Sequence, residues 1–175
     1  MSMTPLNPAL SVGVLTVSDR SSAGAREDLS GVRIVEWCEA RSYRVEEYSI
    51  VPDETSDIVS LLIRWADAEI DLIITTGGTG FTRRDVTPEA TRAVLDREAP
   101  GIAEEIRRRG LKATPHSILA RGVAGIRGRT LIVNFPGSPG GVTDSLAVLE
   151  PVVDHAVALL RGADAPHVAG GDVHE

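Results

Sequence analysis

The residues best suited to chemistry stand in one stretch near the middle of the chain, which reads TTGGTGFTRRDVTPE over residues 75–89. Glycine occupies three of four consecutive positions, Gly77, Gly78 and Gly80, so the backbone can reach positive φ and approach a ligand closely. The N–H groups of such a turn can converge on an anion. Two cations, Arg83 and Arg84, and the carboxylate of Asp85 follow directly. The stretch therefore predicts a phosphate-binding turn.

A purely structural interpretation of this stretch remains open. Glycine turns also join strands to helices because the chain must turn tightly, and Asp85 could fold back on Val86 and Thr87 as a turn residue. Paired arginines beside a carboxylate are not required by a turn, and they favour phosphate binding. The sequence is not a P-loop, because the only lysine is Lys112. It also lacks the dinucleotide fingerprint, because Arg83 stands where the third glycine belongs.

A second carboxylate, Asp53, lies between a predicted strand (43–51) and a predicted helix. An aspartate before a helix can cap its free N–H groups, and position alone favours this structural role. The alternative is that Asp53 lies at the same sheet edge as the glycine turn. In that case Asp53 and Asp85 could share a magnesium ion, which is commonly held by one or two carboxylates plus substrate phosphates.

Two further predicted strands end in turns with ligand-binding potential. Ser18 and Asp19 follow the predicted strand 11–17, and local capping is as good an explanation for them as ligand contact. The glycine-rich turn 136–141 follows the predicted strand 130–135 and leads into a helix. It is either a plain connection or a second anion or ring contact. Open α/β sheets bind ligands beyond the carboxyl ends of their strands, so these turns are candidates for one site.

The remaining pattern alternates strands and helices. Apolar spacing predicts helices over residues 30–41, from residue 55 onward, 88–97 with Thr87 as N-cap, 102–109, and 142–160 with a kink at Pro151. A hairpin of 122–126 and 130–135 would place one antiparallel strand in a parallel sheet. Cys38 and Trp65 fall on apolar helix faces and are expected in the core.

Length and composition limit the class of protein. The chain has 175 residues, 42% of them hydrophobic and 25% charged, as expected for one globular domain. A net charge of −7 makes double-stranded nucleic acid an unsuitable partner. One cysteine excludes an internal disulfide, and no apolar run reaches membrane-spanning length, so the cytoplasm is the expected location. We expect a disordered lead-in (1–10), a single domain (11–162) and a flexible tail (163–175).

Four motifs in order resemble the MogA/MoaB family of molybdenum-cofactor biosynthesis proteins: VSDRSSAG, IVPDE, TTGGTGFTRRDVTPEAT and NFPGSPGGV. The resemblance runs from about Ser11 to Leu160. It implies a three-layer α/β fold, with helices on both faces of a mostly parallel sheet, and a homotrimer. The Arg84-Asp85 pair is similar to the adenylylating, MogA-type branch. That branch transfers AMP from Mg-ATP to the terminal phosphate of molybdopterin and releases pyrophosphate.

The resemblance also implies roles for individual residues. Asp53 and Asp85 match the catalytic carboxylates, and we hypothesise that they hold magnesium. The phosphate and nucleotide site would comprise Thr76, Gly77, Gly78, Thr79 and Gly80. Contact with the pterin or its phosphate would come from Ser18, Asp19, Pro136, Gly137 and Ser138. ATP and molybdopterin are then the expected ligands, and a molybdenum insertase is the expected protein partner.

Three other functions are compatible with parts of this pattern. A protein of the same fold could hold and deliver molybdopterin without adenylylating it, since phosphate cradling serves retention as well as chemistry. A nicotinamide-dependent oxidoreductase would use a glycine turn, although the missing third glycine counts against it. A structural or interaction domain is the third alternative.

Overall fold

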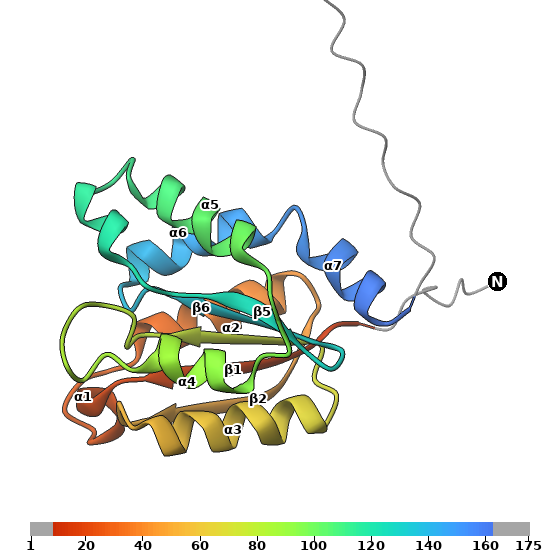
Figure 1. Cartoon of the computed structure of the whole chain (residues 1–175), viewed down its shortest axis with the longest axis horizontal. Helices are drawn as coiled ribbons and strands as arrows, with labels where there is room; N and C mark the ends of the chain where they lie inside the picture. The colour runs from red at the N-terminus through yellow and green to blue at the C-terminus, as the bar shows by residue number, and fades with distance from the viewer. Residues whose placement is uncertain (1–8, 163–175) are drawn as a thin grey trace, which may run out of the picture.

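The computed structural model describes residues 9–162 and shows a sheet between two layers of helices (Figure 1). The predicted tail (163–175) and most of the predicted lead-in (1–10) lie outside the described residues. Of the two lead-in residues that are described, Leu10 is buried, and its carbonyl accepts a hydrogen bond from the Arg44 N–H at 2.8 Å.

The sheet has the strand order β2-β1-β3-β6-β5-β4. Its strands are β1 (Ser11–Val17), β2 (Arg44–Val51), β3 (Leu72–Thr76), β4 (Arg97–Glu98), β5 (Ala124–Arg127) and β6 (Thr130–Phe135). The first four in spatial order, β2, β1, β3 and β6, are parallel, and β5 is antiparallel to both of its neighbours. The predicted hairpin is therefore confirmed. Every residue of β1, β3 and β6 is buried, as expected for parallel strands covered on both faces.

The helices cover both faces of this sheet, which confirms the three-layer α/β fold (Figure 1). They are α1 (Asp19–Ser22), α2 (Leu29–Ala40), α3 (Thr55–Asp67), α4 (Thr87–Val94), α5 (Pro100–Gly110), α6 (Pro139–Leu149) and α7 (Val153–Leu160), with a 3₁₀ helix η1 (Pro115–Leu119). Helices α3 and α4 pack on one face, and α2, α5, α6 and α7 pack on the other. No helix within residues 9–162 is both long enough and apolar enough to cross a membrane.

Alternation along the strands divides the core into two layers. In β1, Val12 and Val14 face the α2 side while Leu15 faces the α3 side, because successive side chains of a strand point to opposite faces. Cys38 and Trp65 are buried, as predicted. Burial raises the pKa of the Cys38 thiol to about 12, so this cysteine is a packing residue rather than a nucleophile.

Two helix boundaries differ from the sequence prediction. The helix expected to reach residue 97 ends at Val94, because the chain extends there and the Asp96 N–H pairs with the Ile126 carbonyl at 2.8 Å, next to the short strand β4. The long helix expected over 142–160 is two helices, α6 and α7. Pro151 lies in the break between them, where its missing N–H cannot continue the helical hydrogen bonds.

Candidate active site

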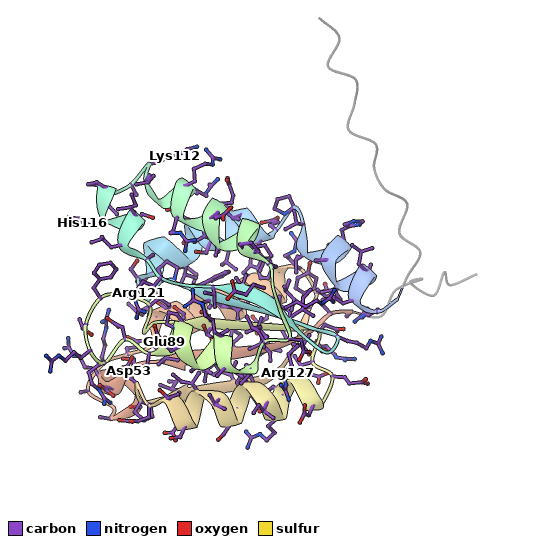
Figure 2. The ribbon with its side chains drawn as sticks, viewed as in Figure 1. Asp53, Glu89, Lys112, His116, Arg121 and Arg127 are labelled. Atoms are coloured by element: carbon purple, nitrogen blue, oxygen red, sulfur yellow. The ribbon has the colours of Figure 1, made fainter. Side chains whose placement is uncertain are left out.

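The carboxyl ends of β1, β2, β3 and β6 meet at one edge of the sheet, because these strands are parallel. The turns that follow them surround a cavity of about 340 Å³. Its walls include Ser18 after β1, Asp53 after β2, the glycine turn after β3, and Gly137 and Ser138 after β6. Figure 2 shows Asp53 at this edge. The structure thus brings the turns that the sequence singled out into a single site.

Asp53 and Asp85 line this cavity together. Asp53 does not cap α3, because the N-cap residue is Glu54 and no side chain caps this helix. The interpretation of Asp53 as a helix cap is therefore wrong. Its Oδ2 accepts the Asp19 N–H at 2.9 Å, and its own N–H donates to Asp19 Oδ1 at 3.0 Å. This reciprocal pair turns the Asp53 carboxylate away from the helix and toward the cavity.

The electrostatics of Asp53 suit a site for a cation. Burial raises the pKa of its carboxyl group above the ordinary value, and the carboxylates of Asp19 and Asp85 raise it further, against the lowering effects of the Asp19 N–H and Arg84. Negative charge is therefore concentrated at the cavity, and a bound cation would relieve it. Within residues 9–162 no three histidine, cysteine or acidic side chains form a metal-binding group. A pair of carboxylates nevertheless fits magnesium, which takes its other ligands from substrate phosphates and water.

Asp85 closes a small turn in the loop after the glycines. Its Oδ2 accepts the Thr82 N–H at 2.8 Å, and its N–H donates to the Thr82 carbonyl at 3.1 Å. The carboxylate thus folds back toward Thr82 and not toward Val86 and Thr87. It lies directly over Gly80, where an added Cβ would come within 2.9 Å of Oδ2. A side chain at position 80 would displace the carboxylate.

The glycine turn depends on two residues with positive φ, Gly77 at 93° and Gly78 at 65°. A Cβ at Gly77 would lie 2.2 Å from the Val17 carbonyl oxygen, and one at Gly78 would lie 2.3 Å from Thr87 Oγ1 and 3.0 Å from Asp53 Oδ1. The Thr87 hydroxyl donates to the Gly77 carbonyl at 2.9 Å. Thr87 is therefore not the N-cap of α4, a position taken by Val86, because its hydroxyl holds the turn instead.

The N–H groups of this turn are not equivalent. That of Gly77 already donates to the Phe135 carbonyl at 3.3 Å, so Gly77 contributes conformation and not a free donor. Among the described residues, the N–H groups of Gly78 and Gly80 have no acceptor. Thr79 is buried, and Thr76 donates its hydroxyl to the Pro136 carbonyl at 2.7 Å.

The turn after β6 lies against the glycine turn. A Cβ at Gly137 would come within 3.2 Å of the Gly77 Cα. The Gly137 carbonyl accepts the Ser30 hydroxyl at 2.9 Å. Ser138 caps α6, and its Oγ accepts the Gly141 N–H at 3.1 Å. Because Pro139 has no N–H and the Val142 N–H donates to the Ser138 carbonyl at 2.9 Å, the Gly140 N–H is the one donor in this first turn without an acceptor among the described residues.

At the opposite wall, Ser18 and Asp19 both have structural partners. Ser18 caps the short helix α1 through the Ser21 N–H at 3.1 Å. Arg84 donates to both carboxylate oxygens of Asp19, at 3.0 and 2.9 Å, and lies 2.8 Å from Glu54. The hydrogen bonds from Arg84 hold the pKa of Asp19 below its ordinary value. Asp19 thus holds Asp53 through two hydrogen bonds without lining the cavity, whereas Ser18 lines the cavity directly.

A second cavity, of about 670 Å³, adjoins the first and is more apolar. It extends between the glycine loop, α5 and η1, and its walls include Phe81, Ile106, His116 and Leu119. Pro136, Thr79 and Gly80 line it as well. The two cavities share the residues Gly78, Asp85, Gly137 and Ser138. A ligand group at this shared wall would touch the contents of both cavities.

Several residues at the site were not predicted from the sequence. Arg26, Asp28 and Ser30 line the first cavity from the loop and helix start that follow α1. Arg121 contacts the glycine loop from the connector after η1. The start of α2 after the first motif was the available signal for the first three. Arg121 carries no such signal, because its partners lie 41 and 36 residues away along the chain.

Comparison with known proteins agrees with this geometry. A sequence family described as "Probable molybdopterin binding domain" matches residues 13–155. A protein named molybdopterin adenylyltransferase from Helicobacter pylori is 43% identical, over 86% of this chain and 88% of its own length. Gephyrin from Dictyostelium discoideum is 42% identical over 86% of this chain, but the chain spans only 22% of gephyrin's length.

The solved structures give the same result. The crystal structure of the molybdopterin biosynthesis enzyme MoaB from Thermus thermophilus is 51% identical with a TM-score of 0.82, covering 87% of this chain and 97% of its own. The family match over residues 13–155 includes all of the turns that line the first cavity. The chain belongs to the molybdopterin-binding family that includes the MogA and MoaB proteins of molybdenum-cofactor biosynthesis.

Proposed function

We propose that this protein transfers AMP from ATP to the terminal phosphate of molybdopterin. The observation that carries the proposal is the pair of cavities that meet at Gly78, Asp85, Gly137 and Ser138. Two ligands that are to be joined through phosphate need adjoining sites with a common polar wall. The 43% identical relative named molybdopterin adenylyltransferase supports this reaction over simple retention of the pterin.

In the proposed reaction, a phosphate oxygen of molybdopterin attacks the α-phosphorus of ATP. A new oxygen–phosphorus bond forms, the bond to the β-phosphate oxygen breaks, and pyrophosphate leaves with the bonding electrons. Such transfers need mainly positioning and stabilisation of charge. The N–H groups of Gly78 and Gly80 would hold phosphate oxygens, and their lack of an acceptor among the described residues supports this role. Gly77, through its positive φ, and Thr76, through its hydrogen bond to the Pro136 carbonyl, support the shape of the turn, and Thr79 would add a hydroxyl to the phosphate site.

The two carboxylates complete the proposed site. Asp53 and Asp85 would hold magnesium, which when bound offsets phosphate charge and polarises phosphorus. The raised pKa of Asp53 supports this role, because neighbouring positive charge does not offset the burial of its carboxylate and the charges of Asp19 and Asp85. Ser18, Pro136, Gly137 and Ser138 would contact the pterin or its phosphate, and Asp19 would hold Asp53 in place.

We further propose that the protein forms a homotrimer in the cytoplasm and passes its product to a molybdenum insertase. Exposed apolar side chains on α2 and β2, those of Leu29, Val32, Tyr48 and Ile50, offer a surface for subunit contact. The product would be held for transfer at the open sheet edge. Sedimentation of the purified protein tests the trimer.

Substitution of Asp85 tests the catalytic proposal. Asp85→Asn keeps the shape of the side chain but removes its charge, so we expect the rate of adenylylation to fall about a hundredfold or more while the protein stays folded. The measurement is pyrophosphate release that depends on both molybdopterin and magnesium. Asp57→Asn, on the exposed surface of α3 away from both cavities, is the matched control. A normal rate in Asp85→Asn would remove the assignment.

The delivery function makes a different prediction in the same assay. A protein that only holds molybdopterin would bind it without releasing pyrophosphate from ATP. Wild-type protein that binds molybdopterin but gives no adenylylated product would favour that function.

A further inference from the structure

The loop that carries Asp85 has little burial to hold it. Phe81 is 69% exposed, and Thr82, Arg83 and Arg84 are also exposed. The bonds between Thr82 and Asp85 close the turn on itself but do not fix it to the rest of the protein. Its position must therefore depend on polar contacts with neighbouring elements.

Arg121 supplies contacts at both ends of this loop. Its Nε donates to the Gly80 carbonyl at 2.7 Å, and its Nη2 donates to the Asp85 carbonyl at 2.7 Å. Its own N–H donates to the Thr79 carbonyl at 2.9 Å. A planar guanidinium can hold two carbonyl oxygens in a fixed relation, because its donors form a rigid fork. One residue thus fixes the spacing between the glycine turn and Asp85.

Glu89, in the first turn of α4, holds Arg121 in turn. Its carboxylate accepts a hydrogen bond from Arg121 Nη1, which leaves the other two nitrogens directed at the loop. Burial alone would raise the pKa of Glu89, but the contact with Arg121 outweighs it, and the pKa lies below its ordinary value. Figure 2 shows Glu89 on α4 and Arg121 beside it at the site edge of the sheet. Helix α4 therefore anchors the loop through this pair.

We propose that Arg121, anchored by Glu89, is a positioning residue that sets the place of Asp85 in the active site. This inference rests on the proposed function of Asp85. Arg121 lines neither of the two cavities that we assign to substrates, so it acts through the loop backbone. It also accounts for the final glutamate of the TTGGTGFTRRDVTPE stretch, to which the proposed reaction gives no role.

Arg84 is the other side chain that ties this loop to the protein, through Asp19 and Glu54. Its side chain is 54% exposed, whereas that of Arg121 is 30% exposed. Exposed ion pairs contribute little to fixing a segment, since solvent screens them. Arg121 also binds backbone carbonyls directly, so we expect it to be the stronger constraint.

The test is Arg121→Gln, compared with Arg127→Gln. Arg127 is a close match, because its side chain is 27% exposed and it also donates to a backbone carbonyl, that of Val94 at 3.1 Å, and pairs with a carboxylate, Asp67. It lies at the other end of the sheet (Figure 2). For Arg121→Gln we expect kcat to fall about tenfold to a hundredfold with KM for ATP changed less than about threefold, because misplacement of a catalytic group acts on the transition state.

A second readout follows the loop itself. Hydrogen exchange of the Thr82 and Asp85 amides, which are hydrogen-bonded within the loop, should become about tenfold faster in Arg121→Gln and stay unchanged in Arg127→Gln. Glu89→Gln should give the same pattern with a smaller effect, and it retains Arg121 if the first variant folds poorly. Arg121→Lys should be more active than Arg121→Gln but less active than wild type. A lysine ammonium group keeps the positive charge, but it cannot hold both carbonyl oxygens in a fixed relation.

Three results would overturn the proposal: a normal kcat in both the Arg121→Gln and Glu89→Gln variants, unchanged exchange of the Thr82 and Asp85 amides in Arg121→Gln, or equal losses in the Arg127→Gln control. Failure of the proposed function is distinguishable from these. A wild-type protein without adenylyltransferase activity would refute that function, while the exchange experiment would still report whether Arg121 positions the loop.

Discussion

Asp71 lies at the amino end of the parallel strands and Asp53 at their carboxyl end, and the two carboxylates have different surroundings. Asp71 immediately precedes β3, and Arg161 donates to both of its carboxylate oxygens, at 2.8 and 2.5 Å. Ser11 adds its N–H and its hydroxyl, both at 2.9 Å. Burial alone would raise the pKa of Asp71, but these partners outweigh it and hold the pKa below its ordinary value.

Asp53, beyond the carboxyl end of β2, has the opposite balance. Burial and two neighbouring carboxylates raise its pKa, and its hydrogen-bond donor is the Asp19 N–H. The amino edge of the sheet thus satisfies its buried charge, while the carboxyl edge leaves charge incompletely neutralised. The proposed site for a cation and phosphates would gain from such an unsatisfied arrangement, at some loss of stability.

The largest expected effect on stability comes from removing the charge of the Asp71 carboxylate. Asp71→Asn removes the charge that Asp71 contributes to its ion pair with Arg161, whose side chains are 17% (Arg161) and 12% (Asp71) exposed. We expect the free energy of unfolding to fall by about 3 kcal/mol, as for other buried pairs that lose one partner. Urea unfolding measures the change. Asp67→Asn, in an exposed pair with Arg127, should cost less than about 1 kcal/mol. An equal loss of unfolding free energy in Asp71→Asn and Asp67→Asn would contradict the difference between the two ion pairs.

A smaller effect is expected from pH. The folded pKa of Asp71 is below its unfolded value, so its contribution to stability is present above the unfolded pKa, about 3.9, and is lost as pH falls through the folded pKa. The stability difference between wild type and Asp71→Asn should therefore shrink as pH falls below about 4. Unfolding curves at a series of pH values measure it. A difference that grows in acid would contradict the assigned sign.

The smallest effect on stability is expected from substitution of Asp53. Its raised folded pKa means that its contribution to stability is present below the unfolded pKa and is lost as pH rises through the folded pKa. Asp53→Asn should therefore raise the unfolding midpoint at neutral pH slightly, by about 1 to 2 °C, while abolishing adenylylation. Calorimetry with an activity assay tests both. A clear loss of stability would show that Asp53 is a structural residue like Asp71.

Parts of the site that depend on adjacent residues were predicted from the sequence. The positive φ values of Gly77 and Gly78 follow from glycine chemistry in a strand-to-loop turn. The hairpin of β5 and β6 follows from two short apolar runs with a glycine between them. Asp53 shows the limit of this reasoning, because capping was the better local explanation for it. Its hydrogen bonds to Asp19, 34 residues away, gave the different answer.

The sequence alone indicated most strands and helices and the glycine turns between them, because hydrophobic alternation and glycine turns act over a few neighbouring residues, whereas the three-layer arrangement was implied by the resemblance to the MogA/MoaB family. The tertiary structure decided which side chains act together. Parallel strand order brought Asp53 and Asp85 to one cavity, and folding of the chain placed Arg121 against the Gly80 and Asp85 carbonyls. Such contacts depend on how whole elements pack, and no local pattern of residues encodes them.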